Sequence, residues 1–269
     1  MTRVAVVGAT GRMGQLVARL VEQTPGFELV ASLDSKGELS DMLGADVAFD
    51  VTLPQVSPKV VEFAVAHGIN AVVGTSGWSG ERIESLRRAI DGNLAVGVLI
   101  VPNFSIGSVL ATSFAALAAR YFDSIEIVEA HSASKVDSPS GTAVRTAELI
   151  GAARSELGPV GAPHADQRAR GQQVGSVPVH SLRMQGVLAK QDVHFGGVGE
   201  VLTLTHETIS PAAYEAGILV ALRAARDARG VTVGLENLLD LRIAPVGRAP
   251  KGGSPDGAVS GQAAAATSS

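Results

Sequence analysis

The stretch Val4-Ala-Val-Val-Gly-Ala-Thr-Gly-Arg-Met-Gly14 decides the fold of the first part of this chain. Its run of four apolar residues, Val4 to Val7, has the length and the β-branched composition of a buried strand. Gly8, Gly11 and Gly14 follow, and a helical pattern begins at about Met13. Glycines at these places permit a tight turn, a close approach of the backbone to a pyrophosphate, and close packing of the helix on the strand. The stretch therefore predicts a strand–turn–helix unit that binds a dinucleotide.

A second feature of the predicted nucleotide site is Asp34, which lies 20 residues after Gly14 at the end of the second expected strand. A carboxylate at this place accepts hydrogen bonds from the adenosine ribose of NADH, and it repels the 2′-phosphate of NADPH. Arg12 and Lys36 carry the opposite charge, and either could neutralise such a phosphate. The choice between NADH and NADPH therefore stays open.

Short β-rich runs alternate with helical patterns through the first hundred residues. The expected strands are 4–7, 28–32, 47–51, 70–73 and 95–101, and the expected helices are 13–23, 58–67 and 81–90. Ser57 and Pro58 mark the start of the second helix, with the serine hydroxyl as its cap. Such alternation is typical of a doubly wound parallel sheet of the Rossmann type in the α/β class.

The middle of the chain has a different pattern, with several strands and fewer helices. The expected strands are 125–130, 177–184, 187–195 and 201–206, with Gln185-Gly186 as a turn and 158–176 as a long surface loop. These features predict a second α+β domain with an open, mostly antiparallel sheet. A last long helix is expected from Ser210-Pro211 to about Arg229. Residues 242–269, rich in Ala, Gly, Ser and Pro, are expected to form a disordered tail.

The segment from Glu129 to Ala143 carries the strongest indication of chemistry. It places His131 and Lys135 four residues apart, before the turn Pro139-Ser140-Gly141 and an apolar pattern that predicts a helix. The backbone N–H groups of Ser140, Gly141 and Thr142 are then expected at a helix N-terminus, where unpaired donors and the helix dipole attract an anion. A site for an anion beside possible proton donors indicates a small organic acid as substrate.

With these motifs the chain resembles the dihydrodipicolinate reductase family, whose signature reads roughly E-x-H-H-x-x-K-x-D-A-P-S-G-T-A. The match departs at two places, Ser132 for the second histidine and Ser138 for the alanine before the proline. Further matches are 8–14, Val51-Thr52, 73–77, 101–105 and 193–197, so that the resemblance extends from Val4 to about Leu241.

The resemblance implies an activity: the NAD(P)H-dependent reduction of 4-hydroxy-tetrahydrodipicolinate to tetrahydrodipicolinate, in lysine and diaminopimelate biosynthesis. It implies that His131 and Lys135 are the proton donors and that Gly141 and Thr142 bind a substrate carboxylate. Hydride transfer builds negative charge on the substrate ring, so a nearby cation lowers the barrier and then delivers a proton. Ser132 stands where the family has a histidine that contacts the substrate.

The resemblance also implies the cofactor residues, the domains and the assembly. The cofactor residues are Gly8, Ala9, Thr10, Gly11, Arg12 and Met13 at the first turn, Asp34 at the ribose, and Gly74, Thr75, Ser76, Val101, Pro102, Asn103 and Phe104 at the nicotinamide end. Residues 1–103, completed by 214–241, are expected to form the dinucleotide-binding domain, and 104–213 the substrate-binding and oligomerisation domain. The expected assembly is a homotetramer.

Ser132 keeps two alternatives open, because a serine donates a hydrogen bond but carries no charge. One is a diverged reductase of another carboxylated cyclic imine. The other is a nucleotide-binding sensor without catalysis, against which the presence of both His131 and Lys135 argues.

Bulk composition excludes several other classes of protein. The chain has 269 residues, 46% of them hydrophobic and 18% charged, which suffices for a large core and excludes global disorder. A net charge of −4 gives no reason to expect a nucleic acid or an anionic membrane as partner. The absence of cysteine excludes disulfides and thiolate metal sites, and no metal ligand cluster is apparent. With no signal peptide or membrane span visible, a cytoplasmic protein is expected.

Overall fold

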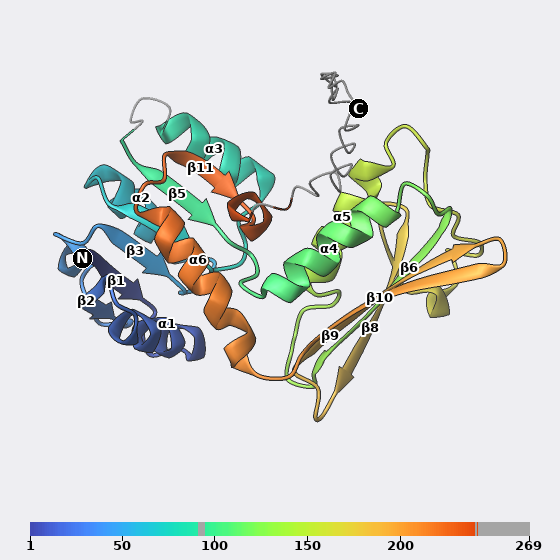
Figure 1. The fold of residues 1–269 in the computed structure, drawn as a ribbon, viewed down its shortest axis with the longest axis horizontal. Helices are drawn as coiled ribbons and strands as arrows, with labels where there is room; N and C mark the ends of the chain where they lie inside the picture. The colour runs from blue at the N-terminus through green and yellow to red at the C-terminus, as the bar shows by residue number, and fades with distance from the viewer. Residues whose placement is uncertain (91–94, 240, 242–269) are drawn as a thin grey trace, which may run out of the picture.

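The computed structural model describes residues 1–90, 95–239 and 241 and contains two sheets (Figure 1). The helices and strands follow one another as β1 (Thr2–Val7), α1 (Arg12–Gln23), β2 (Phe27–Leu33), η1 (Leu39–Met42), β3 (Val47–Asp50), α2 (Ser57–Ala66), β4 (Asn70–Val73), α3 (Gly80–Ile90), β5 (Gly97–Ile100), α4 (Ile106–Ala118), β6 (Ser124–Ser132), α5 (Gly141–Ala153), η2 (Arg168–Arg170), β7 (Gln172–Val174), β8 (Val177–Met184), β9 (Ala189–Gly197), β10 (Glu200–Thr208), η3 (Pro211–Tyr214), α6 (Glu215–Ala225), β11 (Gly230–Val233) and η4 (Leu235–Leu238), where η denotes a short 3₁₀ helix.

The first sheet is parallel throughout, with the strand order β11-β5-β4-β3-β1-β2. Helices α1 and α6 pack on one face, and α2 and α3 pack on the other. Both faces are therefore covered, which explains why strands such as β3 and β4 are buried along their whole length and read as continuous apolar runs. The predicted doubly wound parallel sheet is confirmed.

Parallel pairing brings the ends of β1, β3, β4 and β5 to one edge of this sheet. The loop after β1 approaches β2, because the N–H groups of Gly8 and Ala9 both donate to the carbonyl of Leu33, at 2.9 Å each. In open α/β sheets, ligands bind outside this carboxyl edge. The fold therefore places the predicted cofactor turns next to one another.

The second sheet has the order β10-β9-β6-β8-β7 and is antiparallel except for the β6–β8 pair. Helices α4 and α5 cover one of its faces (Figure 1). The side chains Ile127, Val179, Val193 and Phe195 meet these helices in a buried core. The predicted α+β unit with a mostly antiparallel sheet is also confirmed.

Some local predictions were wrong. Ser57 does not cap α2: the cap position is Val56, and the Ser57 hydroxyl instead donates to the buried carboxylate of Asp50. The last helix is shorter than expected, because a 3₁₀ turn precedes α6 and the helix ends at Ala225. The expected loop 158–176 includes η2 and the edge strand β7. The turn at Gln185-Gly186 follows β8, but it does not join paired strands, because β6 lies between β8 and β9.

The expected tail, 242–269, lies outside the residues that the structure describes. In the part of the chain that is described, no helix is long and apolar enough to cross a membrane.

Candidate active site

The turn after β1 has the backbone that a bound pyrophosphate requires. Gly8 has a φ of 89°, and a Cβ atom there would lie 2.6 Å from the carbonyl oxygen of Val51. A side chain at Gly14 would meet the backbone of Gly8, so only glycine lets α1 start this close to β1. Gly11 caps α1 without a side-chain hydrogen bond, and no acidic residue occupies the first turn. The N-terminus of α1 therefore fits the negative charge of a dinucleotide.

Asp34 follows β2 and is exposed, as are Arg12 and Lys36. One carboxylate oxygen of Asp34, Oδ1, accepts a hydrogen bond from the backbone N–H of Lys36 at 2.8 Å. This bond fixes Asp34 at the end of the second strand, where a ribose is bound in folds of this kind.

Two further loops meet at the same edge. Gly74 follows β4, and a side chain there would collide with the ring of Phe104, which packs on Phe49 with ring centroids 5.4 Å apart. The amide of Asn103 donates to the hydroxyl of Ser108 at 2.9 Å and to that of Thr142 at 3.3 Å. The loop after β5 is thereby tied to the first turn of α5. The residues predicted to bind the nicotinamide are thus in direct contact with those predicted to bind the substrate.

A buried carboxylate orients His131. Glu129 and His131 are two residues apart on β6 and so share one face of the sheet. The Nδ1 atom of His131 lies 2.6 Å from Oε2 of Glu129, whose side chain is fully buried. Because a carboxylate only accepts, Nδ1 carries the hydrogen and Nε2 is left for the cavity.

Arg183 on β8 balances the charge of Glu129. Its two terminal nitrogens donate to both carboxylate oxygens at 2.9 Å, and one of them also donates to the carbonyl of Asp137 at 2.6 Å. Burial raises the pKa of Glu129, but the hydrogen bonds from His131 and Arg183 outweigh it and lower that pKa from 4.5 to about 2. Glu129 is therefore a carboxylate at neutral pH, held by the same arginine that holds the loop containing Lys135.

Lys135 lies on this loop, with its Nζ atom 2.8 Å from a carboxylate oxygen of Asp137. Burial alone would raise the pKa of Asp137, but the hydrogen bond and the charge of Lys135 lower it. Lys135 lines a cavity of about 440 Å³ together with His131, Gly141 and Thr142. The two predicted donors are thus brought to one cavity.

The helix N-terminus expected after the Pro139-Ser140-Gly141 turn is the start of α5. Ser140 caps the helix, since its hydroxyl accepts from the N–H of Ala143 at 3.3 Å and its own N–H donates to Glu129 at 3.2 Å. The N–H groups of Gly141 and Thr142 have no hydrogen-bond partner among the described residues. These two donors line the cavity beside Lys135 and suit a carboxylate.

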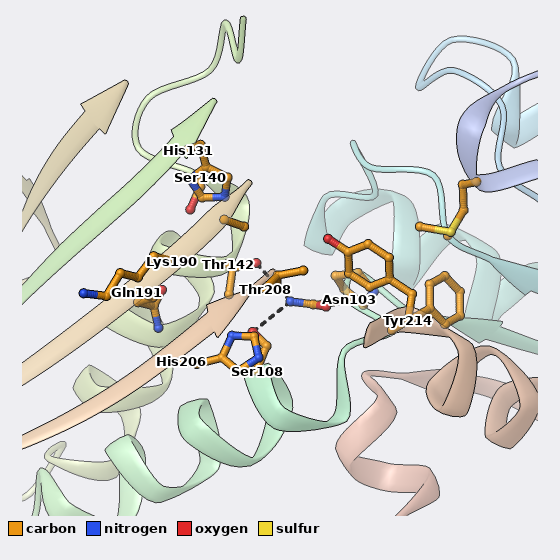
Figure 2. Close-up of a pocket in the computed structure, with 15 residues that line it drawn as sticks. Asn103, Ser108, His131, Ser140, Thr142, Lys190, Gln191, His206, Thr208 and Tyr214 are labelled. Carbon is orange, nitrogen blue, oxygen red and sulfur yellow. Dashed lines mark hydrogen bonds between the residues drawn. The ribbon is translucent and has the colours of Figure 1, made fainter. Parts of the chain in front are cut away.

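A second, smaller cavity of about 200 Å³ adjoins the first (Figure 2). Pro102, Asn103, His131 and Thr142 line both cavities. Met13 in the first turn of α1 and Gly74 after β4 line the smaller cavity on one side, and Gln191 and His206 of the second sheet line it on the other. The two cavities form one cleft between the nucleotide turns and the second sheet.

Gln191 and His206 are site residues that the sequence did not predict. Strand register places Glu129, Gln191 and His206 side by side on β6, β9 and β10. The preceding row on the same face, Ile127, Val193 and Leu204, is apolar. On each of these three strands, one residue packs in the apolar core, and the next residue on the same face, two positions away, belongs to the site. Burial lowers the pKa of His206, and its Nε2 atom lies 3.1 Å from the Ser105 hydroxyl.

Some predicted residues do not line either cavity. Ser132 follows His131 directly and so points to the opposite face of the sheet, where its hydroxyl lies 3.0 Å from that of Ser134.

Of the predicted cofactor residues in the first turn, only Met13 lines the cleft; Gly8 to Arg12 lie farther along the edge of the first sheet. Thr75, Ser76 and Pro102 do line the cleft, and the nearly buried Phe104 lines its smaller cavity; Val101 is buried and lines neither cavity. No metal-binding cluster of His, Asp or Glu occurs in the described residues.

A dinucleotide turn, an anion site and two candidate proton donors at one cleft define a nicotinamide-dependent oxidoreductase with a small acid as substrate. Comparison with known proteins identifies the family. The model of the N-terminal part of dihydrodipicolinate reductase matches residues 2–104, and that of its C-terminal part matches residues 107–239. The chain therefore belongs to the dihydrodipicolinate reductase family, as its motifs predicted.

Individual relatives agree with this assignment. The chain is 70% identical to 4-hydroxy-tetrahydrodipicolinate reductase of Clavibacter sepedonicus, over 99% of each chain. It is 46% identical to the protein of that name in Streptomyces griseus, over 89% of this chain and 98% of the other. Among solved structures, the dipicolinate-bound dihydrodipicolinate reductase of Paenisporosarcina sp. TG-14 matches with a TM-score of 0.76 and 32% identity, over 89% of this chain and 100% of that one.

Proposed function

We propose that this protein reduces 4-hydroxy-tetrahydrodipicolinate to tetrahydrodipicolinate with NAD(P)H, a step of lysine and diaminopimelate biosynthesis. The observation that carries the proposal is the cleft itself. On one side lie loops that fit a nicotinamide dinucleotide, and on the other lie His131, Lys135 and the N-terminus of α5. Retention of both candidate donors argues against a sensor without catalysis.

The residues of the cleft have separable tasks. The free N–H groups of Gly141 and Thr142 hold a substrate carboxylate, and Asn103 keeps Thr142 against the loop after β5. Glu129 orients His131 through Nδ1 and leaves Nε2 toward the cleft. The cofactor, when bound, supplies a hydride; Lys135 and His131 stabilise the charge that develops on the ring and deliver a proton. The substrate loses its hydroxyl as water in the overall reaction.

One assay tests the activity: oxidation of NADH and of NADPH by the purified protein with freshly generated 4-hydroxy-tetrahydrodipicolinate. Turnover that depends on this substrate is expected. Nucleotide binding without turnover would contradict the proposal and favour a reductase of another carboxylated cyclic imine, for which Ser132 is the argument.

We also propose that Asp34 binds the adenosine ribose, so that the affinity for NADH depends on this residue more than the affinity for NADPH does. Asp34→Ala is expected to weaken NADH binding about tenfold, the usual scale for a hydrogen bond to a charged group, and to change NADPH binding less. NADPH binding changes less because the variant also loses the negative charge that repels the 2′-phosphate of NADPH. Isothermal titration with both nucleotides measures the ratio.

Asp41→Ala is the matched control, because Asp41 is an exposed aspartate on η1, next to the second strand. It is expected to leave both affinities unchanged. A ratio of NADH to NADPH affinity that stays the same in Asp34→Ala would falsify the assignment of Asp34 to the ribose.

For the assembly we propose a homotetramer built through the uncovered face of the second sheet. The α-helices α4 and α5 cover only the opposite face (Figure 1), and on this face the short helix η2 contacts the sheet through the ion pair of Arg170 with Glu126. On the uncovered face, Leu182 and Met184 of β8 are 45% and 49% exposed and Val201 of β10 is 72% exposed. Leu182 and Met184 are neighbours on this face of β8, and large apolar side chains exposed together on a sheet favour packing against a second sheet.

Light scattering at micromolar concentration is expected to give a particle four times the 27.4 kDa of the chain. Leu182→Glu is expected to dissociate it, since it buries a charge in the proposed interface. Leu157→Glu, at an exposed leucine beyond α5, is the control that should leave the assembly intact. A 27.4 kDa particle for the unaltered protein would refute the proposal.

We also propose that the chain consists of two domains with different functions. Residues 1–103, completed by 214–241, form the dinucleotide-binding domain, and 104–213 form the domain that binds substrate and oligomerises. A role in biosynthesis that consumes NAD(P)H favours the cytoplasm as location.

A further inference from the structure

Gln191 is a buried residue of the cleft with an unused hydrogen-bond acceptor. Its side chain is 8% exposed and lines the smaller cavity with His131 and His206 (Figure 2). Its Nε2 atom donates to the hydroxyl of Thr146 at 3.0 Å, whereas its Oε1 atom has no partner among the described residues. A buried acceptor without a partner costs about 1–3 kcal/mol. Such a group in a binding cavity indicates a ligand that supplies the missing donor.

The hydrogen bonds around Thr146 fix which end of the amide faces the cavity. The Thr146 hydroxyl donates its only hydrogen to the carbonyl of Thr142, 2.9 Å away in the same helix. Toward Gln191 it can therefore act only as an acceptor, so the group bound to it must be the NH₂ end. The hydroxyl of Thr112, 3.0 Å from that of Thr146, completes this buried network. The amide oxygen of Gln191 is left for the cavity.

The other groups that the site offers to the substrate are mainly donors. Lys135, His131 and the N–H groups at the start of α5 suit the substrate's two carboxylates, which only accept hydrogen bonds. An acceptor is of no use to a carboxylate. The substrate named for the relatives differs from its reduced product by a hydroxyl group at ring position 4, and a hydroxyl is a donor.

We propose that Oε1 of Gln191 accepts a hydrogen bond from the 4-hydroxyl of the substrate and so selects the hydroxylated ring. This inference rests on the proposed function and deepens it. Tetrahydrodipicolinate, which has lost the hydroxyl, does not make this contact, and neither does dipicolinate. Gln191 therefore favours substrate over product, while the carboxylate site binds both.

The test compares two ligands on one variant. Gln191→Met, which keeps the size of the side chain and removes the acceptor, is expected to raise KM and the Kd for 4-hydroxy-tetrahydrodipicolinate about tenfold. The Kd for dipicolinate, measured by titration without nucleotide, is expected to change less than twofold. Gln173→Met is the matched control: Gln173, on the remote edge strand β7, also has an unpaired amide atom. It should alter neither ligand.

Gln191→Asn, which withdraws the oxygen by one methylene, gives the second reading if the methionine variant does not fold, and the same selective loss is expected. Equal weakening of both ligands would overturn the inference and make Gln191 a residue that only shapes the cavity. Unchanged binding of both would overturn it as well. An unaltered protein that binds the hydroxylated compound but does not reduce it would defeat the proposed function and leave this comparison of affinities intact.

Discussion

Lys135→Ala is expected to lower kcat at least a hundredfold while the affinity for NADH stays nearly unchanged. Lys135 lines the same cavity as the free N–H groups of Gly141 and Thr142, so its charge lies next to a bound carboxylate and the substrate ring. A positioned proton donor contributes typically a hundred- to ten-thousandfold to the rate. Steady-state kinetics combined with titration of NADH separates the two effects.

Lys59→Ala serves as the control, because Lys59 is an exposed lysine on α2, on the far side of the first sheet. It is expected to behave like the unaltered protein in both measurements. If NADH affinity and turnover fell together in Lys135→Ala, Lys135 would belong to the cofactor site or to the fold, and its role as donor would be wrong.

The parallel sheet could be predicted because both of its faces are buried. Strands β3 and β4 are fully buried, so each reads as an unbroken run. Gly14 is required by a contact within the first turn, whereas Gly8 is required by the backbone of Val51 at the end of β3, the strand beside β1 in the sheet. Helix α4 was not predicted. It lies between the second sheet, α5 and η4, so it has apolar and small residues on most sides and lacks the one-sided pattern of a surface helix.

The site could be predicted where its residues are close in sequence. His131, Lys135 and the first turn of α5 fall within one segment, and local turn chemistry relates them. Arg183 binds Glu129 across 54 residues of sequence, and Gln191 reaches the cleft only because β9 pairs with β6 in one particular register. No pattern within a strand reveals which polar residue lies opposite another. Ser57 shows the same limit, since its partner Asp50 comes from the strand before the helix.

The buried ion pair of Glu129 and Arg183 has a consequence for stability at low pH. The pKa of Glu129 is about 2 in the folded protein and 4.5 as an ordinary carboxyl. A depressed pKa contributes stability that is fully present above 4.5 and is lost as the pH falls toward about 2. The difference between 4.5 and about 2 corresponds to roughly 3 kcal/mol. This contribution is therefore constant from pH 7 down to about pH 5.

Glu129→Gln is accordingly expected to lower the free energy of unfolding by roughly 3 kcal/mol at pH 7, because it leaves Arg183 with no charged partner. Below about pH 4.5 the deficit should shrink, since the unfolded chain then takes up a proton that the folded carboxylate does not bind until about pH 2. Turnover should fall too, because Glu129 orients His131 and receives the N–H of Ser140. Urea unfolding at pH 7 and pH 3 measures the stability, with Glu22→Gln on the exposed side of α1 as control. A deficit that is the same at both pH values would mean that the loss comes from packing and that the charge of Glu129 does not stabilise the fold.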